Sequence, residues 1–581
     1  MNARVRILVP AVLASLLALT ALPAAGSESD RGGSPLGKIN HIVVIYQENH
    51  SFDNLYGGWE GVNGLTNARA SQTLQVKQNG TVFACLMQND VNLAAVLPAN
   101  CADTTGTPAN TPFTSAFTNA PFQIDAYIPA SARTCPVPGA PFSPHGYKEG
   151  PSNLPGGCTE DIVHRFYQEQ YQLNNGQQNH YTAGSDAAGL TQGYYNTRAL
   201  PIYQYLHEED HPNYAIADNF FQGAFGGSFL NHQWLIAAAS PTWPGAPAAV
   251  HSIIDSNGMP NATYPLYTPT GPVLDKQVTQ VCPSAVVGRA CGDYAINTIQ
   301  PAYQPFKGSP QLPPQTGKTI GDELSAAGVS WAWYSGGWSN ADGDVGAPGW
   351  TNGTTPGVCT DPYSAPNPAY PYCPNKVFQF HHQAFNYFAN YAPGTPARAQ
   401  HLRDEAEFLS LAKSSREERC NLQSVSFVKP IGLDNEHPGY TSETAGSSHL
   451  VKLLKAIERS ACAKDTLVVT TYDEFGGQWD HVAPPGQGTT VGPHDLWGPG
   501  TRIPALIIAP RLRGDFVVDS AQHDTTSILA TIEHRFGLAP LGTRDAAVKD
   551  LSTVFKAREG GDGGEGDGGG GGGGDKRTTN N

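Results

Sequence analysis

Runs of consecutive apolar and β-branched residues are the clearest pattern along the chain. Three of them occupy residues 41–46 (HIVVIY), 466–472 (TLVVTTY) and 503–509 (IPALIIA). Their length and composition predict strands that are buried on both faces, as in a parallel sheet. Helical patterns precede the second run at 450–461 and follow the third at 526–536. This alternation of strands and helices predicts an α/β fold with helices covering the sheet.

Composition indicates that long loops connect these elements. Of the 581 residues, 39% are hydrophobic and 15% are charged, and there are 64 glycines and 47 prolines. Such a chain can bury a large core, but its composition disfavours a coiled coil or a helical bundle. The net charge of −15 gives no electrostatic basis for holding a nucleic-acid backbone. No nucleic-acid partner is therefore expected.

Residues 1–26 have the order of a secretory signal peptide. Arg4 and Arg6 precede an apolar run at 7–22, and small residues follow at 24–26. The run is short for a bilayer span, and a retained N-terminal anchor is the alternative interpretation. We expect an exported protein, periplasmic or extracellular, without stable membrane insertion.

The other end of the chain, residues 559–581, consists mainly of glycine. We expect a disordered tail there, because glycine cannot build a core. The intervening residues 27–558 contain no comparable linker and no internal repeat. One large domain with long loop insertions is the preferred organisation, and two domains are the alternative. The sequence carries no signal for the oligomeric state.

Ten cysteines in an exported chain predict disulfides rather than metal ligands, because the compartment is oxidising and no Cys-x-x-Cys pair occurs. Pairing of neighbours along the chain closes short loops in regions rich in proline and glycine. The expected pairs are Cys85–Cys101, Cys135–Cys158, Cys282–Cys291, Cys359–Cys373 and Cys420–Cys462.

Acidic and amide side chains follow two of the predicted strands. Glu48 and Asn49 come after the first strand, and Asp473 and Glu474 come after the second. Open α/β sheets bind ligands at the carboxyl ends of their strands, where these carboxylates would repel one another without a cation. Their convergence predicts one divalent metal ion, with Ca²⁺, Mg²⁺ or Mn²⁺ favoured over Zn²⁺ by the oxygen ligands. Taken singly, each acidic turn also fits a helix cap or a solvated loop.

A serine stands where a helix is expected to begin. Ser228 follows Gly226 and Gly227 and leads into a helical pattern at 233–239. The free N–H groups and the dipole of a helix N-terminus favour an anion such as phosphate and lower the cost of forming an alkoxide. Ser228 is therefore a candidate nucleophile, and an ordinary serine N-cap is the alternative.

Histidines add to this chemistry, since the chain has 18 of them. Several lie in polar segments next to glycine or proline, where an imidazole can donate to phosphoryl oxygens or protonate a leaving alkoxide. Each of them alone also fits a structural role. The candidates are His164, His381, His382, His437 and His523.

Three segments resemble the signatures of a known family. They are residues 45–57 (IYQENHSFDNLYG), 472–485 (YDEFGGQWDHVAPP) and 500–504 (GTRIP). All three are similar to motifs of the bacterial phosphoesterase family that contains phospholipases C and secreted acid phosphatases, and the likeness spans about residues 38–540. The resemblance implies an alkaline-phosphatase-like, doubly wound, mostly parallel sheet flanked by helices. It also implies hydrolysis of a small-molecule phosphoester through a covalent phosphoenzyme.

The resemblance assigns roles to the residues already singled out. It implies that Ser228 is the nucleophile and also touches the metal. The implied metal ligands from the strand ends are Glu48, Asn49, Asp473 and Glu474. The residues implied to contact phosphate or to act as acid and base are Asn231, His164, His381, His382 and His437.

Within the family, the surroundings of the nucleophile favour the acid phosphatases. Phospholipase C members commonly carry threonine there, with Pro-Asn-Arg closely following, whereas Ser228 is followed by Phe-Leu-Asn-His at 229–232. We also expect no accessory β-domain after residue 538, because about 40 residues follow and roughly half of them are the glycine tail. We therefore expect a phosphomonoesterase that forms a phosphoserine, with a phospholipase C that cleaves phosphodiester headgroups as the alternative.

Two other classes of protein are considered. A serine esterase would place its nucleophile in a Gly-x-Ser-x-Gly elbow, which does not surround Ser228. A carbohydrate-binding or surface-binding module would expose tryptophans, but it leaves the paired acidic turns unexplained. The tryptophans that suggest such a module are Trp234, Trp331, Trp333, Trp338 and Trp350.

Overall fold

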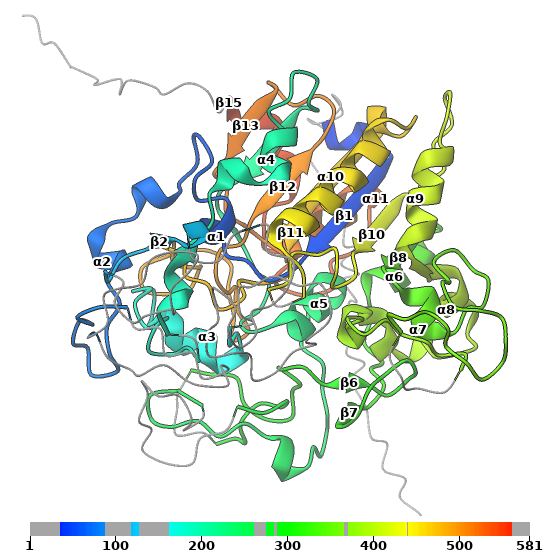
Figure 1. Ribbon diagram of the computed structural model, residues 1–581. Coiled ribbons are helices and arrows are strands. Elements are labelled where there is room, and N and C mark those ends of the chain that lie inside the picture. Colours follow the sequence, from blue (N-terminus) through cyan, green and yellow to red (C-terminus); the bar gives the residue numbers. More distant parts are fainter. Residues whose placement is uncertain are drawn as a thin grey trace, which may run out of the picture.

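The three apolar runs form neighbouring strands near the middle of one sheet (Figure 1). They are β1 (His41–Gln47), β11 (Thr466–Tyr472) and β12 (Ala505–Ile508). Every residue of β11 is buried, as is every residue of β1 after His41. Among the described residues the sheet has nine strands, in the order β15 (Arg558–Glu559), β13 (Phe516–Asp519), β4 (Tyr214–Ala217), β12, β11, β1, β10 (Val425–Lys429), β8 (Trp331–Ser335) and β9 (Leu402–Asp404).

The computed structural model describes residues 35–86, 101, 118–126, 130, 162–186, 188–260, 275–283, 288–364, 370–438 and 440–559. The predicted signal peptide, Cys135, Cys158 and the glycine-rich tail after Glu559 lie outside these residues. Glu559 itself belongs to β15, which pairs with β13.

Parallel pairing dominates the sheet. β1 runs parallel to both β10 and β11, and the parallel order continues through β8 to β9. β12 is antiparallel to both of its neighbours, so the parallel orientation predicted for 503–509 is wrong. Two strands that follow one another in the chain can pair in parallel only through a crossover connection, which is usually a helix. The fully described segment 473–504 contains neither helix nor strand, and the chain therefore turns back into β12 from the same end of the sheet.

Helices flank the sheet. In Figure 1, α10 lies across the front of the strands in contact with α4 and α9, whereas α11 lies behind the strands and contacts α5. α11 has the predicted bounds, and α10 covers most of the predicted helix at 450–461, so the doubly wound, mostly parallel α/β fold is confirmed. The α-helices are α1 (Phe52–Leu55), α2 (Ala70–Thr73), α3 (Phe166–Leu173), α4 (Pro201–Tyr205), α5 (Ser228–Ala237), α6 (Ile320–Ala326), α7 (Trp338–Asp342), α8 (Pro396–His401), α9 (Glu405–Ser414), α10 (Glu443–Glu458) and α11 (Thr526–Phe536).

Short strand pairs fix some of the loops outside the main sheet. These pairs are β14 (His523–Asp524) with β5 (Phe220–Phe221), β2 (Phe122–Gln123) with β3 (Gly193–Tyr194), and β6 (Gln300–Pro301) with β7 (Gln311–Leu312).

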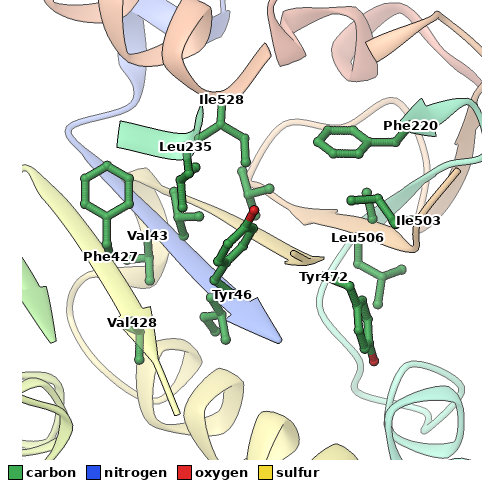
Figure 2. Packing of buried hydrophobic residues seen from close by; sticks show 14 of the residues in the cluster. Val43, Tyr46, Phe220, Leu235, Phe427, Val428, Tyr472, Ile503, Leu506 and Ile528 are labelled. Carbon is green, nitrogen blue, oxygen red and sulfur yellow. The ribbon is translucent and has the colours of Figure 1, made fainter. Parts of the chain in front are cut away.

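One continuous apolar core joins the sheet to the helices behind it. Figure 2 shows Val43 and Phe427 from the strands together with Leu235 of α5 and Ile528 of α11. Trp234, Trp331, Trp333 and Trp338 are buried in this core, and Trp350 is half-buried. They do not form an exposed aromatic surface, so the interpretation as a surface-binding module is wrong.

Four of the five predicted disulfides are present, and the fifth lies outside the described residues. The observed bonds are Cys85–Cys101, Cys282–Cys291, Cys359–Cys373 and Cys420–Cys462. Within the described part of the chain, none of the helices combines the length and apolar character needed to cross a membrane.

Candidate active site

The residues that follow β1 and β11 meet at the carboxyl end of the sheet. The two strands pair in parallel as far as Gln47 and Tyr472, so the next residues of each strand lie beside one another. The backbone N–H of Asn49 donates to Asp473 Oδ1 at 3.2 Å. Asn49 has a φ of 57°, in the left-handed region that asparagine tolerates better than most residues. The fold thus brings Glu48 and Asn49 together with Asp473.

Ser228 is the first residue of α5 and faces these side chains. Gly227 takes the N-cap position, so Ser228 is not an ordinary serine N-cap. Its Oγ lies 3.1 Å from Glu48 Oε2, 3.4 Å from Asn49 Oδ1 and 3.4 Å from Glu474 Oε1. A hydroxyl has one proton and cannot donate to three oxygens at once. The Ser228 hydroxyl and these three oxygens are close enough together to coordinate one cation.

Asn231 holds the loop that precedes Ser228. Its Nδ2 donates to the carbonyl oxygens of Gly226 at 3.1 Å and Gly227 at 3.3 Å. Its Oδ1 accepts from the backbone N–H of Ala224 at 2.9 Å. These contacts position the loop before Ser228, and a contact between Asn231 and phosphate stays a prediction.

Glu169 of α3 supports the same loop, although no sequence motif indicates this role. Its carboxylate accepts from the N–H of Gly226 at 2.5 Å and from Gln222 Nε2 at 2.9 Å. It also accepts from the N–H of Thr501 at 2.7 Å and from its hydroxyl at 2.8 Å. Burial raises the pKa of Glu169 to about 7. Glu169 thereby ties residues 500–504 to the loop before Ser228.

Three of the predicted histidines contact the carboxylates or the amide of the site. His164 Nε2 lies 3.3 Å from Glu474 Oε1, and His382 Nε2 lies 3.2 Å from Glu48 Oε1. His437 Nε2 lies 3.1 Å from Asn49 Nδ2. The structure therefore gathers these imidazoles, which come from segments far apart in the sequence, around the residues at the two strand ends.

The remaining histidines divide between the site and the scaffold. The ring of His381 packs edge-on against His382, and burial lowers the pKa of His381 to about 3. Burial also lowers the pKa of His382 and of His437 well below the usual histidine value, which keeps them neutral. His523 lies elsewhere, bonded to Thr553 Oγ1 at 2.9 Å.

Two further residues that were not predicted from the sequence lie in the site. His232, one turn along α5, stacks on His382 with ring centroids 4.9 Å apart and lies 3.7 Å from Asp473 Oδ2. Lys429 ends β10, the strand beside β1, and its ammonium forms an ion pair with Glu48 Oε1. Neither residue is part of a matched motif. A lysine that ends an apolar strand, as in VSFVK at 425–429, could have indicated a buried functional cation.

The donor set fits a metal ion. Glu48, His232 and His382 each offer a ligand atom, and these atoms lie within 4.8 Å of one another. Asp473 Oδ2 is buried and, among the described atoms, has no hydrogen-bond partner, as expected of a ligand oxygen. Burial raises the pKa of Asp473, so its negative charge needs a counter-charge. The imidazoles add nitrogen donors to the oxygen-rich set predicted from the sequence.

A second group with metal-ligand geometry is paired with an arginine of the protein. Asp53, Asp480 and His481 also have ligand atoms within 4.8 Å of one another. However, Arg502 Nη2 lies 3.0 Å from Asp53 Oδ1, and Arg502 Nε lies 3.1 Å from Asp480 Oδ1. We call these four residues the ion-pair cluster. Its guanidinium takes the place that a metal ion would need.

Comparison with known proteins agrees with this geometry. The profile described as "Phosphoesterase family" matches residues 39–539, and the chain belongs to that family. Phospholipase C B of Mycobacterium tuberculosis is 25% identical over 550 residues, which cover 90% of this chain and 78% of the relative. Non-hemolytic phospholipase C of Burkholderia pseudomallei is 28% identical over 271 residues, 41% of this chain and 35% of the relative. The chain is a hydrolase that acts on phosphoesters.

A likeness to a solved structure is weaker. Lipoteichoic acid synthase LtaP of Listeria monocytogenes aligns over 61% of this chain and 69% of its own, with 10% identity and a TM-score of 0.23. A score of that size supports no inference about this chain.

Proposed function

We propose that this protein is a metal-dependent phospholipase C that cleaves the phosphodiester of a phospholipid headgroup. The observation that carries the proposal is the Ser228 hydroxyl at the start of α5, within 3.4 Å of oxygens from both strand ends. The choice of a diester rests on the relatives, because phospholipases C match along 90% of the chain. Four disulfides support an exported protein.

The arrangement of side chains supplies each step of such a reaction. The Ser228 oxygen attacks phosphorus in line, and the bond between phosphorus and the diacylglycerol oxygen breaks as the new bond forms. The serine proton passes to a facing carboxylate, of which Glu48 Oε2 is nearest at 3.1 Å. His164, whose side chain is partly exposed at the edge of the site, protonates the leaving oxygen.

Water then cleaves the phosphoserine. Its hydroxyl bonds to phosphorus, its proton returns to His164, and the Ser228 oxygen recovers the proton held by the carboxylate. The phosphorylated headgroup leaves, and the enzyme is restored. A divalent ion held by Glu48, Asp473 and their neighbours would supply Lewis-acid stabilisation of the phosphoryl oxygens.

A phosphomonoesterase is the second candidate function. The segment at 229–232 reads Phe-Leu-Asn-His, which departs from the phospholipase C pattern described above. The same nucleophile and histidines can cleave a monoester, because only the leaving group and the substituent on phosphorus differ. Substrate choice therefore separates the two candidates.

A substrate comparison tests the proposal. The purified protein is assayed with phosphatidylcholine vesicles and with p-nitrophenyl phosphate, with and without EDTA. We expect diacylglycerol release that is lost with EDTA and in Ser228→Ala, and retained in Thr319→Ala, which removes a hydroxyl that caps α6. Hydrolysis of p-nitrophenyl phosphate alone would support the monoesterase instead. Absence of both activities would contradict a phosphoesterase site at Ser228.

A further inference from the structure

Gln222 is a buried amide that joins two loops of the site and lies outside the three family motifs. It directly follows β5 and is fully buried. Its Oε1 accepts from the backbone N–H of Phe475 at 3.0 Å. Its Nε2 donates to the carbonyl oxygens of Ala224 at 2.8 Å and Gly226 at 3.0 Å. One side chain thus bonds the loop before Ser228, residues 223–227, to the loop that follows β11.

Both ends of this bridge lie next to residues of the candidate active site. Phe475 directly follows Glu474, whose Oε1 lies 3.4 Å from Ser228 Oγ. The other oxygen of Glu474 accepts from the N–H of Gly476 at 2.6 Å, which fixes the carboxylate to its own loop. Gly226 stands two residues before Ser228. The amide therefore connects the loop that carries the nucleophile with the loop that carries a facing carboxylate.

Glu169 completes the bridge on the side of the loop before the nucleophile. Gln222 Nε2 lies 2.9 Å from Glu169 Oε2, and the same oxygen accepts from the N–H of Gly226 at 2.5 Å. Both backbone polar groups of Gly226 are thus bound, one by each side chain. Gly226 has a φ of 89°, and a Cβ there would lie 2.7 Å from the backbone nitrogen of Phe166. Only glycine fits this conformation, so the backbone of the loop is closely defined.

The position of the nucleophile depends on these side-chain bonds. Residues 222–227 form neither helix nor strand, and Ser228 is the first residue of α5. No sheet or helix hydrogen bonds therefore hold the loop in place. In-line attack requires the reacting atoms to be about 3–3.5 Å apart and aligned, and a displacement of about 1 Å can lower the rate ~100-fold.

We propose that Gln222 is a positioning residue that holds Ser228 Oγ in place for attack, by fixing the loop before it against the loop that carries Glu474. This inference rests on the proposed function, in which Ser228 is the nucleophile. Loss of the amide leaves every group of the site present but frees the two loops to shift relative to one another. The attack on phosphorus should then be slower, whereas substrate binding should change little.

Single-turnover kinetics test this inference. Gln222→Met keeps the length of the side chain and removes both of its hydrogen-bonding groups. An excess of enzyme is mixed with the p-nitrophenyl phosphomonoester or phosphodiester that wild type hydrolyses, and nitrophenolate release is followed. The concentration of folded enzyme is taken from circular dichroism at the assay temperature. We expect the maximal rate to fall at least ~10-fold and the half-saturating enzyme concentration to change less than about twofold.

A matched control separates positioning from stability. Gln315 is also a buried amide, and it bonds to the N–H and carbonyl of Thr242 and to the carbonyl of Pro313. Gln315→Met should therefore lower the Tm and keep the single-turnover rate per folded molecule. Gln222→Asn, whose side chain is one methylene shorter, should show the same loss of rate and replaces Gln222→Met if that variant does not fold.

The outcomes distinguish this inference from the proposed function. An unchanged rate per folded molecule in the Gln222 variant would overturn the inference, as would an equal loss of rate in Gln315→Met. Either result would leave the proposed function standing. If wild type cleaves neither class of ester, or if Ser228→Ala stays active, the proposed function fails and this inference fails with it.

Discussion

Two clusters of buried charge lie beyond the same strand ends, and they differ in how their carboxylates are neutralised. In the ion-pair cluster, Asp53 and Asp480 share the guanidinium of Arg502, at 3.0 and 3.1 Å. At the Ser228 site, where three carboxylates converge, the ammonium group of Lys429 pairs with Glu48. In the first cluster the cation contacts both carboxylates, whereas in the second the cation contacts one carboxylate of three.

The pairing of the carboxylates distinguishes a structural cluster from a ligand site, which the distances between ligand atoms do not. Both clusters place metal-ligand atoms within 4.8 Å of one another. In the ion-pair cluster, Arg502 and His481 outweigh burial and hold the pKa of Asp53 below its usual value, while burial raises the pKa of Asp480 to about 6. Burial raises the pKa of Asp473, and its Oδ2 has no hydrogen-bond partner among the described atoms. Of the two clusters, the one at Ser228 therefore has the unpartnered carboxylate oxygen that fits a ligand.

The largest expected effect is on turnover. Ser228→Ala should lower kcat by at least ~10³-fold, because the covalent nucleophile is lost. Thermal stability should change little, because Gly227 and not Ser228 caps α5. Steady-state assays and a thermal melt on the same preparation check both statements. A variant that keeps more than about a tenth of wild-type activity would contradict the assignment.

Breaking the ion-pair cluster should lower the stability of the fold, in contrast to the loss of turnover expected for Ser228→Ala. Arg502→Met removes the guanidinium that two buried carboxylates share and should lower the free energy of unfolding by ~3–5 kcal/mol. Arg403→Met is the control, since Arg403 forms a partly exposed pair with Glu407 that is worth at most ~1 kcal/mol. Denaturant unfolding of both variants measures the difference. Equal losses in the two variants would show that the ion-pair cluster does not have the structural role argued here.

Asp473 provides the matching test at the site. Asp473→Ala should lower metal content and kcat together, by ~100-fold for kcat, as expected when a ligand and its charge are lost. Asp404→Ala removes a carboxylate that caps α9, and it should cost ~1 kcal/mol of stability with turnover intact. Elemental analysis and kinetics decide between these outcomes. Unchanged metal content and kcat in Asp473→Ala would make the four residues at the strand ends structural.

The sequence predicted the features that depend on short local patterns, namely the buried strands and the acidic residues that follow them. The apolar runs predicted β1 and β11, and the acidic residues after them had to meet because parallel strands end at the same edge. The orientation of β12 was missed, because its pattern is the same in either direction and the loop at 473–504 decides it. Lys429 and Glu169 were missed because each acts through a distant segment that only the fold brings close.

Glu169 is a buried carboxylate of a third kind, because neutral N–H and O–H donors contact it and no charged side chain pairs with it among the described residues. Its donors come from Gly226, Gln222 and Thr501. These donors only partly offset burial, which raises the pKa of Glu169 to about 7. The folded protein therefore binds this proton more tightly than the unfolded chain, whose glutamates titrate near ~4.3.

The pH dependence of stability follows from that difference. Because the folded state holds the Glu169 proton more tightly, its stabilising effect is fully present at low pH and is lost as the pH rises toward about 7. Between pH 5 and 7 this loss amounts to ~2 kcal/mol in the free energy of unfolding. Glu169→Gln stays neutral and should remove that part of the slope, while Glu407→Gln on the surface should not. Denaturant unfolding at several pH values measures both slopes, and an unchanged slope in Glu169→Gln would show that the carboxyl is ionised in the folded protein.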